Sequence, residues 1–468
     1  MNRLVVTSDT DLAVTLARLR TAWQANHPSL TQRRDDLMRL RTVFKERMPQ
    51  MVQAISADFG HRSPYESLLA DGMTVLNGID YLRKHLRAWM KPRRIRIGWR
   101  LWPARAELRP QPVGVVGVIS PWNYPVNLAL MPLATAIAAG NHVYLKPSEH
   151  TPRTTQFLAD LLAEVFPSDR VAVAVGDARV AGEFSELPFD HLFFTGSTAV
   201  GRKVMAAAAA NLTPVTLELG GKSPAIVCDD YPIARVAARL ATGKWFNAGQ
   251  TCIAPDYVLV GPARRDALID AFHEQIRARY GPSANHADYT RIITPDHYAR
   301  LQAYVDDARA RGWDVLTLAE GDPAQCVFPP TLILDPENDA RVMQEEIFGP
   351  VLPIVTIDSL DDAIAYIRRR ERPLALYPFS ASRATVNRIL QAVLPGGVTV
   401  NDTLLHFAVD ALPFGGVGAS GIGAYHGKAG FDTFSKMLPI VWQARHANSD
   451  LLKPPYAGIA KLIRFLVR

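Results

Sequence analysis

Helical spacing of apolar residues dominates the first part of the chain, over Leu12–Trp89. Charged residues separate the members of one such run, which contains Leu37, Leu40, Val43 and Phe44. This pattern is typical of helices that bury one face. We therefore expect a set of helices before the first strand.

The period of the pattern changes near Arg94. Over 94–102, apolar residues occupy every second position, at Ile95, Ile97, Trp99 and Leu101. Such alternation predicts a half-buried strand. A second alternating run is expected to be its partner and contains Ala104, Ala106 and Leu108. Because a two-stranded ribbon is only marginally stable alone, we expect it to pack against another surface, such as a second subunit.

From Val113 onward, strand-like runs alternate with helical stretches. The predicted strands are Val113–Ser120, Val143–Lys146, Val171–Val175, His191–Thr195 and Val215–Leu219. The helix expected over Thr151–Val165 can be capped by Thr151 and has Pro152 in its first turn. Alternation of this kind predicts a parallel sheet covered on both faces, with ligands bound beyond the carboxyl ends of its strands.

A second α/β stretch is predicted from about Pro224 to Leu394, followed by the glycine-rich segment Pro413–Gly421. At 468 residues the chain is too long for one ordinary core, so two or three domains are expected. Hydrophobic residues make up 48% and charged residues 21%, which is typical of folded, water-soluble proteins.

The three cysteines, Cys228, Cys252 and Cys326, match no zinc-site or redox-pair spacing, so no metal is expected. Free thiols and the lack of a signal-peptide pattern favour the cytoplasm. The most apolar stretch, Leu128–Gly140, is too short to span a bilayer. The net charge is +7, with many basic residues over Arg83–Arg109. A solvated basic face explains them better than nucleic-acid binding, because no stacking aromatics or binding motif accompany them.

Three loops at predicted strand ends carry the candidate chemistry: Pro121–Pro125, Glu218–Lys222 and Phe246–Tyr257. In the third loop, small neighbours would expose the sulfur of Cys252. An aldehyde cannot readily give up hydride until a nucleophile has added to its carbon, and a thiolate is suited to that addition. The side-chain amide of Asn123 and the Cys252 N–H could stabilise the resulting oxyanion. A carboxylate such as Glu218 could activate the water that hydrolyses the thioester.

Each of these residues alone favours a structural interpretation: a buried thiol for Cys252, and turn or capping roles for Asn123 and Glu218. Their combination with other motifs changes that interpretation. In order along the chain stand PWNYP, KPSE, FTGST, LELGGK, GQTC, EEIFGP and PFGG. Together they resemble the aldehyde dehydrogenase superfamily over roughly Asp58 to Phe434, and GQTCIAPDYV resembles its class 3 members.

This resemblance implies an α/β, aldehyde dehydrogenase-like fold, with two Rossmann-like parallel-sheet domains and a small β oligomerisation ribbon. The implied division is a cofactor-binding domain (1–93 and 113–218), a catalytic domain (219–394), and the ribbon with the C-terminal segment (94–112 and 395–468). By position, Cys252 corresponds to the nucleophile, Asn123 to the oxyanion donor and Glu218 to the general base.

The resemblance also implies NAD as cofactor, with NADP possible. The cofactor residues it assigns are Trp122, Lys146, Glu149, Gly196, Ser197, Glu346 and Phe348. Lys146 and Glu149 would hold the adenine ribose, and Gly196 and Ser197 would approach the pyrophosphate at a helix N-terminus. The dinucleotide fingerprint GxGxxG is absent, since this loop reads GSTAVG. The expectation of NAD(P) therefore rests on the family.

Within class 3, the string DFGHRSPYE, together with KPRR, resembles bacterial coniferyl aldehyde dehydrogenases. That resemblance implies an aromatic substrate, for which Tyr124, Phe407 and Phe414 are candidate contacts, and a homodimer. The alternatives are a medium- or long-chain aliphatic aldehyde, a CoA-acylating relative and a non-catalytic member. Glu218 argues against the CoA-acylating alternative, and the intact motifs argue against a non-catalytic one. The amphipathic tail Ile459–Arg468 is expected to dock on the protein itself, with contact to a membrane surface as the second possibility.

Overall fold

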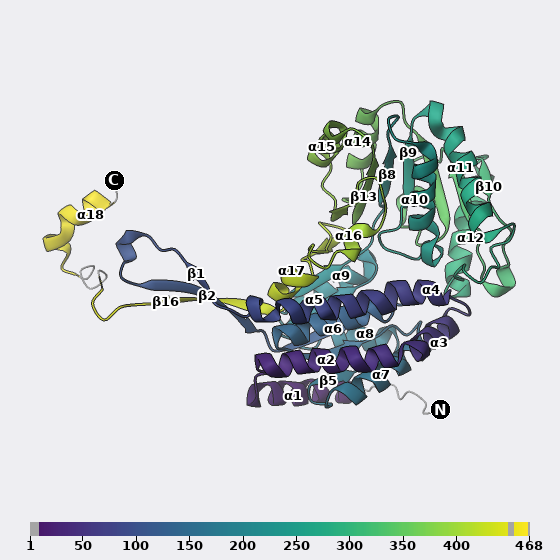
Figure 1. Cartoon of the computed structure of the whole chain (residues 1–468). Coiled ribbons are helices and arrows are strands. Elements are labelled where there is room, and N and C mark those ends of the chain that lie inside the picture. The colour runs from purple at the N-terminus through teal and green to yellow at the C-terminus, as the bar shows by residue number, and fades with distance from the viewer. Residues whose placement is uncertain (1–8, 448–453, 467–468) are drawn as a thin grey trace.

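The computed structural model describes residues 9–447 and 454–466. Figure 1 shows two α/β units joined side by side and an extended ribbon that projects from them. A six-stranded sheet lies in the first unit, in the order β15-β7-β6-β3-β4-β5, and only the β15–β7 pair is antiparallel. Its strands are β3 (Val115–Ile119), β4 (His142–Lys146), β5 (Val171–Val173), β6 (His191–Thr195), β7 (Val215–Glu218) and β15 (Gly421–Ile422). The five strands predicted between Val113 and Leu219 are thus confirmed.

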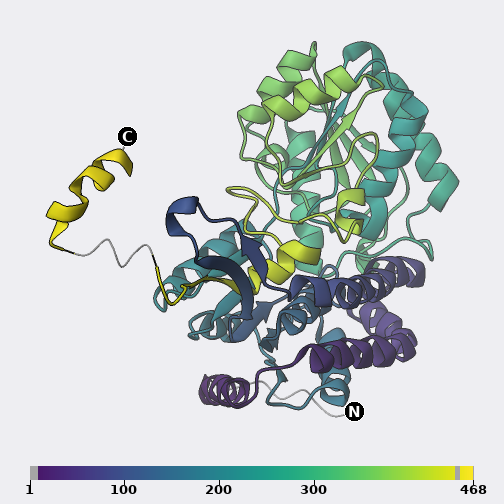
Figure 2. The same ribbon diagram turned by 60° about the vertical axis from the view of Figure 1, so that its left-hand side comes forward.

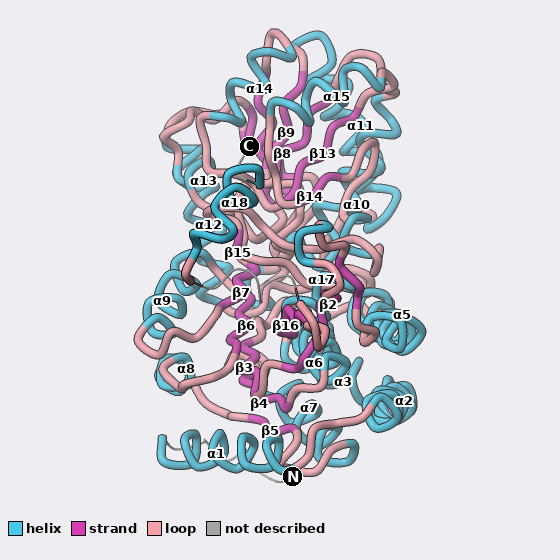
Figure 3. Tube along the Cα trace, turned by 90° about the vertical axis from the view of Figure 1, so that its left-hand side faces the viewer, coloured by secondary structure: helices cyan, strands magenta, loops and turns pink. Residues whose placement is uncertain are grey.

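Successive side chains along a strand point to opposite faces of the sheet. Apolar side chains lie on both faces of this sheet, and helices cover both. Val116 and Val118 of β3 join one apolar core, and Val115 and Ile119 join the other. Figure 3 shows α8 and α9 on one side of the sheet and α6 and α7 on the other. The helices of this unit are α1 (Asp9–Ala25), α2 (Leu30–Glu46), α3 (Met48–Asp58), α4 (Pro64–Ser67), the π-helix η1 (Leu68–Met73), α5 (Thr74–Trp89), α6 (Asn127–Ala139), α7 (Pro152–Val165), α8 (Ala178–Ser185), α9 (Thr198–Ala209) and α17 (Gly427–Thr433).

Helix α7 begins where the sequence predicted, but the expected cap is wrong. Thr151 makes no side-chain capping bond to the helix. Instead, the carboxylate of Asp58, at the end of α3, accepts hydrogen bonds from the backbone N–H groups of Arg153 and Thr154 at 2.9 and 2.8 Å. A cap supplied by another helix leaves no local pattern in the sequence.

A seven-stranded sheet forms the second unit, in the order β10-β11-β12-β9-β8-β13-β14, parallel except for the β10–β11 pair. The strands are β8 (Pro224–Val227), β9 (Tyr257–Val260), β10 (Val315–Thr317), β11 (Thr331–Leu334), β12 (Val351–Thr356), β13 (Ala375–Phe379) and β14 (Gly397–Val398). Its helices are α10 (Ile233–Trp245), η3 (Phe246–Gly249), α11 (Pro262–Tyr280), α12 (Pro295–Ala310), η4 (Pro323–Gln325), α13 (Arg341–Gln344), α14 (Leu360–Arg368), α15 (Arg383–Ala392) and α16 (Leu405–Ala408). The predicted α/β fold with two mainly parallel sheets is confirmed.

The ribbon is a three-stranded antiparallel sheet of β1 (Arg93–Ile95), β2 (Arg105–Pro112) and β16 (Ser435–Trp442). The strand predicted over 94–102 is wrong beyond Ile95. Residues 99–101 form the short helix η2, and the N–H of Leu101 bonds to the carbonyl of Gly98 at 3.0 Å. The alternating residues therefore build the turn that connects β1 with β2. Two of the alternating residues that were expected to be buried are largely exposed in this chain, Trp99 to 69% and Leu101 to 56%.

The C-terminal segment contains η6 (Tyr456–Ile459) and α18 (Ala460–Leu466), and the end of the predicted amphipathic tail lies outside the described residues. Figures 1 and 2 show α18 away from both units, so the expected docking on the body of the same chain is wrong. Within the ranges that the structure describes, none of the helices combines the length and apolar character that crossing a membrane requires.

Candidate active site

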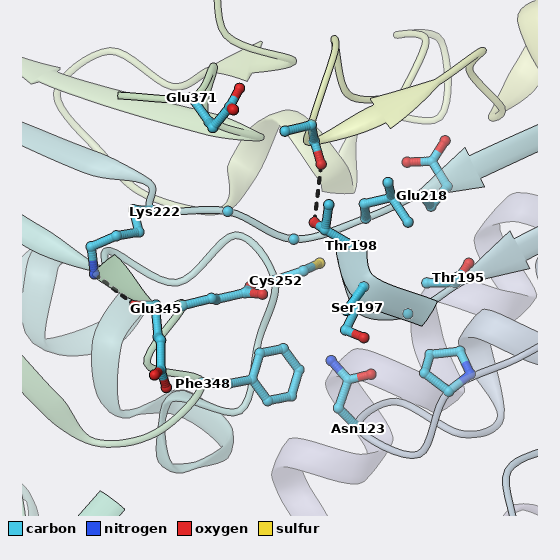
Figure 4. Close-up of a pocket in the computed structure, with 18 of the residues that line it drawn as sticks. Asn123, Thr195, Ser197, Thr198, Glu218, Lys222, Cys252, Glu345, Phe348 and Glu371 are labelled. Atoms are coloured by element: carbon cyan, nitrogen blue, oxygen red, sulfur yellow. Dashed lines mark hydrogen bonds between the residues drawn. The ribbon is translucent and has the colours of Figure 1, made fainter. Parts of the chain in front are cut away.

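A cavity of about 970 Å³ lies between the two units and is lined by loops from both. Asn123 and Glu218 come from the first sheet, after β3 and at the end of β7, and Cys252 comes from the second unit. Figure 4 shows these three side chains around one space, with the ring of Phe348 beside it. The predicted catalytic residues, scattered over the sequence, are thus brought together.

The loop that carries Cys252 is held in an unusual backbone conformation. Asn247 and Ala248 are left-handed, with φ of 54° and 50°, and Gly249 follows at 72°. A Cβ at Gly249 would overlap the carbonyl oxygen of Gly349, so this position requires glycine. The side chain of Gln250 closes the loop: its amide nitrogen donates to the carbonyls of Asn247 and Arg291 at 3.0 and 3.1 Å. The sulfur is thereby fixed in the cavity wall.

The surroundings of Cys252 oppose its ionisation. Burial raises the pKa of the thiol, and the neighbouring carboxylates of Glu346 and Glu218 raise it further. Burial also raises the pKa of Glu218 well above its ordinary value. Neither carboxylate oxygen of Glu218 has a hydrogen-bond partner among the described residues. Perturbed groups of this kind in a cavity are typical of catalytic sites.

The amide of Asn123 faces the same loop. Its nitrogen donates one hydrogen bond, to the carbonyl of Gln250 at 3.1 Å. Since a side-chain amide carries two N–H bonds, the second is available to an oxyanion on a carbon bound to Cys252. This residue is almost fully buried, so its amide is already largely desolvated.

Glu346 and Phe348 lie on a loop that is anchored under the cavity. Lys222 forms a buried ion pair with Asp256 and donates to the carbonyls of Val342 and Glu345 at 2.7 and 3.0 Å. Burial raises the pKa of Glu346 to about 8. The loop thus holds the carboxyl group of Glu346 within the cavity, where desolvation disfavours its charged form.

Three loops at the ends of β3, β4 and β6 carry the other predicted cofactor residues. Trp122 contacts the ring of Phe348, with centroids 5.3 Å apart. Gly196 and Ser197 line the cavity where α9 begins, and Ser197 caps that helix through a bond from the N–H of Val200. Lys146 and Glu149 form an ion pair of 3.6 Å and are not among the cavity's lining residues.

Comparison with known proteins agrees with this geometry. The model of the aldehyde dehydrogenase family matches residues 4–438. The chain belongs to the aldehyde dehydrogenase family. It is 49% identical to a probable coniferyl aldehyde dehydrogenase of Pseudomonas aeruginosa, over 97% of this chain and 95% of that one. It is 42% identical to human aldehyde dehydrogenase family 3 member B1, over 96% and 93%. The predicted family and its class 3 character are confirmed.

Solved structures show the same fold. The substrate-bound state of AldH from Staphylococcus aureus superposes with a TM-score of 0.93 at 37% identity, covering 97% of this chain and 99% of that one. An aldehyde dehydrogenase of Mycobacterium tuberculosis, solved in complex with NAD+, superposes with a TM-score of 0.85 at 28% identity, covering 94% and 91%. The NAD(P)-dependent character of the family applies to this aldehyde dehydrogenase.

The predicted substrate residues of the aldehyde dehydrogenase are not among the lining residues of the cavity. Tyr124 is buried, and its hydroxyl contacts that of Thr251 at 2.5 Å. Phe407 and Phe414 pack together with centroids 4.9 Å apart, in a cluster with His406 and His426. Burial lowers the pKa of both histidines, to about 4 and about 3. The cluster lies beside the site rather than in the cavity wall.

Sequence reasoning missed several residues that build the site of this aldehyde dehydrogenase. Arg62, Glu66 and Asp71 are buried charged residues that contact the loops of Asn123 and Cys252. Lys222 and Asp256 anchor the loop of Glu346. The available signal was weak: Asp71 interrupts an apolar helical stretch, Leu68–Met73, where a charge needs a buried partner.

Proposed function

We propose that this aldehyde dehydrogenase oxidises an aldehyde to a carboxylic acid through a thioester on Cys252. The observation that carries the proposal is the convergence of Cys252, Asn123, Glu218 and Glu346 on one cavity. The thiolate adds to the aldehyde carbon, and the carbonyl oxygen becomes an oxyanion. The second N–H of Asn123 and the backbone N–H of Cys252 stabilise that oxyanion.

Loss of hydride, with its two electrons, converts this adduct into a thioester. Glu218 then takes a proton from water as the water attacks the thioester carbon, and the thiolate leaves. The carboxylate must be ionised to act, and its raised pKa makes it a stronger base once ionised. Glu346, with a pKa of about 8, is a second carboxyl group in the same cavity.

NAD fits the residues that face the cavity. The N-terminus of α9 offers backbone N–H groups to a pyrophosphate, and Gly196 lets the backbone come close to it. One buried oxygen of Glu346 has no hydrogen-bond partner among the described residues. It is therefore available to accept hydrogen bonds from ribose hydroxyls. Trp122 and Phe348 would border the nicotinamide end, and Lys146 and Glu149 would hold the adenine ribose. When bound, NAD supplies the hydride acceptor.

Glu149 favours NAD over NADP, since its carboxylate would repel a 2′-phosphate, without excluding NADP. We assign cofactor binding to residues 1–93 and 113–218, and the nucleophile to residues 219–394. The ribbon and C-terminal segment, 94–112 and 395–468, would join two copies as a homodimer. The three free cysteines agree with a reducing compartment, the cytoplasm.

For the substrate, we propose an aromatic aldehyde such as coniferaldehyde, oxidised to ferulate. The support is the 49% identity to a probable coniferyl aldehyde dehydrogenase. Tyr124, which contacts Thr251 next to Cys252, and the packed rings of Phe407 and Phe414 would supply the aromatic contacts, although none of them is among the lining residues of the cavity. Stacking on such rings contributes about 0.5–1.5 kcal/mol per pair. The alternative is a medium- or long-chain aliphatic aldehyde, with the rings serving only as packing.

A panel of aldehydes tests the function. Coniferaldehyde, benzaldehyde, hexanal and decanal are compared by kcat/KM with NAD and with NADP, in the presence and absence of CoA. We expect NADH without CoA, a preference for NAD, and the highest kcat/KM for coniferaldehyde. Cys252→Ala should abolish turnover while NAD still binds. A tenfold advantage of the aliphatic aldehydes, about 1.4 kcal/mol, would exclude the aromatic assignment. A strict need for CoA would exclude the hydrolytic mechanism.

A further inference from the structure

A buried polar network contacts the loops of Asn123 and Cys252, and its residues are not among those that line the cavity. Arg62 has a fully buried side chain and forms an ion pair of 3.2 Å with Asp71, which is also fully buried. The guanidinium donates to the backbone carbonyl of Asn123 at 3.1 Å. Asp71 accepts hydrogen bonds from the N–H groups of Val126 and Asn127, at 3.1 and 2.9 Å. The loop of Asn123 is therefore held at Asn123 itself and where it joins α6.

The second half of the network reaches the loop of Cys252. Both carboxylate oxygens of Glu66 accept from the N–H of Asn247, at 3.2 and 3.1 Å. One of them also accepts from the hydroxyl of Thr290 at 2.6 Å. Asn247 is the left-handed residue that starts the turn before Cys252. An acceptor fixed on its N–H stabilises a left-handed backbone conformation that is uncommon for residues other than glycine.

The two halves of the network meet at the side-chain amide of Asn247. The side chain of Asn247 donates to the carbonyls of both Asn123 and Gln250, each at 3.1 Å. The carbonyl of Gln250 also accepts from the amide of Asn123. The carbonyl of Asn123 thus receives donors from Arg62 and from Asn247, one from each unit of the molecule. We call Arg62, Glu66, Asp71 and Asn247 the brace.

We propose that Arg62 and Glu66 are positioning residues that, through the brace, fix the amide of Asn123 relative to the sulfur of Cys252. The inference rests on the proposed function, in which these two groups form the oxyanion site. Neither Arg62 nor Glu66 lines the cavity, so both act through the loops they hold. Replacing a buried ion pair by apolar groups often leaves the stability of a protein unchanged. A contribution to stability alone therefore explains this buried network poorly.

The test compares the brace with a matched ion pair elsewhere in the first unit. Arg170 and Asp36 form another buried pair, with side chains 5% and 10% exposed, and neither lines the cavity. The variants are Arg62→Met, Glu66→Ala, the conservative Arg62→Lys and Glu66→Gln, and the control Arg170→Met. For each, kcat, the affinity for NAD, the thermal midpoint and the kinetic isotope effect of aldehyde deuterated at C1 are measured.

We expect Arg62→Met and Glu66→Ala to lower kcat by about tenfold to a hundredfold, because small displacements of catalytic groups have effects of that size. The isotope effect should rise, since hydride loss becomes slower, and NAD affinity should stay unchanged. The conservative variants should recover most of kcat. Arg170→Met should lower only the thermal midpoint. Equal losses of kcat in brace and control variants, or none in the brace variants, would overturn the proposal.

A second measurement needs neither activity nor a folded Arg62→Met protein. Deuterium exchange of the peptide over residues 246–252 reports on the turn that Glu66 holds. Faster exchange there in Glu66→Ala, but not in Arg170→Met, supports the brace, and unchanged exchange contradicts it. If wild type oxidises none of the aldehydes, the proposed function fails while this measurement still decides the brace. In an Asn123→Ala background, the effect of Glu66→Ala on kcat should vanish, and a full additional loss would contradict action through Asn123.

Discussion

Cys252 and Glu218 share a cavity in which burial disfavours the charged form of each. Two negative charges there would also repel each other, so the thiolate and the carboxylate are not favoured together. The proposed mechanism needs them in succession: the thiolate for addition and the carboxylate for hydrolysis. The arrangement therefore suits a reaction that uses its nucleophile and its base in separate steps.

Glu218→Gln separates these steps. Addition and hydride loss do not need the carboxylate, whereas thioester hydrolysis does. We expect a burst of about one NADH per active site followed by slow turnover, measured by stopped-flow absorbance. Cys252→Ala is the control and should give no burst. A normal steady-state rate in Glu218→Gln would mean that another carboxylate, such as Glu346, is the base.

Glu346 should make the stability of the protein depend on pH. Its pKa is raised by folding from 4.5 to about 8, so the folded state holds this proton more tightly than the unfolded state. Stability from this group is complete below pH 4.5 and is lost as pH rises through about 8. The thermal midpoint of Glu346→Gln should fall less over this range than that of wild type. Glu371→Gln, an exposed residue at the same cavity, is the control. Parallel curves for wild type and Glu346→Gln would contradict the raised pKa.

At this scale, the sequence alone indicated the residues to which we assign the chemistry and missed those that hold their loops. Cys252, Asn123 and Glu218 stand in short motifs at strand ends, where neighbours along the chain indicate their role. Arg62 contacts Asn123, 61 positions away, and Glu66 contacts Asn247, which is 181 positions away in the other unit. No local spacing encodes such a contact, so it could not be predicted.

Secondary structure elements were predicted best where a local period coincided with burial. The central strands of the first sheet, β3, β4 and β6, are mainly apolar and are buried along their whole length. The ribbon turn has the alternation of a strand, but Gly98 and Pro103 lie within it and the residues between them form η2. Backbone bonds within this turn, rather than the period of its side chains, determined its structure.

Helix α7 allows a test at this scale. Asp58→Ala removes the acceptor for two N–H groups at its start and should cost about 1–2 kcal/mol. Thr151→Val removes the hydroxyl of the predicted cap and should cost about 0.5 kcal/mol or less, because that hydroxyl makes no capping bond. Thermal unfolding of both variants decides between the two caps. The larger loss in Thr151→Val would show that the local cap, rather than the one from α3, stabilises α7.

At the scale of the whole molecule, the ribbon is a surface on which several large apolar side chains are exposed among the described residues. Trp99, Trp102, Val441 and Trp442 are each more than half exposed there. Large apolar groups gathered in this way are typical of an interface between subunits. We propose that the ribbon and the C-terminal segment pack against a second copy of the chain.

We therefore expect wild type to be a symmetric homodimer in light scattering at micromolar concentration. The double variant Val441→Glu with Trp442→Glu should be monomeric, since charges oppose burial of the ribbon. Leu212→Glu, at a residue that is 89% exposed on the first unit, should remain dimeric. A monomeric wild type, or a dimeric ribbon variant, would show that the ribbon has another role.

The return of the chain to the first unit has a consequence for how the protein is made. Strand β2 pairs along its whole length with β16, and β7 is bordered by β15. Roughly 300 residues separate β2 from β16 in the sequence. A ribosome adding about 5–20 residues per second needs about 15–60 s to reach them. During that interval, the nascent chain carries two open strand edges, which are templates for pairing with other chains. The enzyme is therefore most exposed to pairing with other chains while it is being synthesised. Slow translation of the last part of the message would prolong this interval.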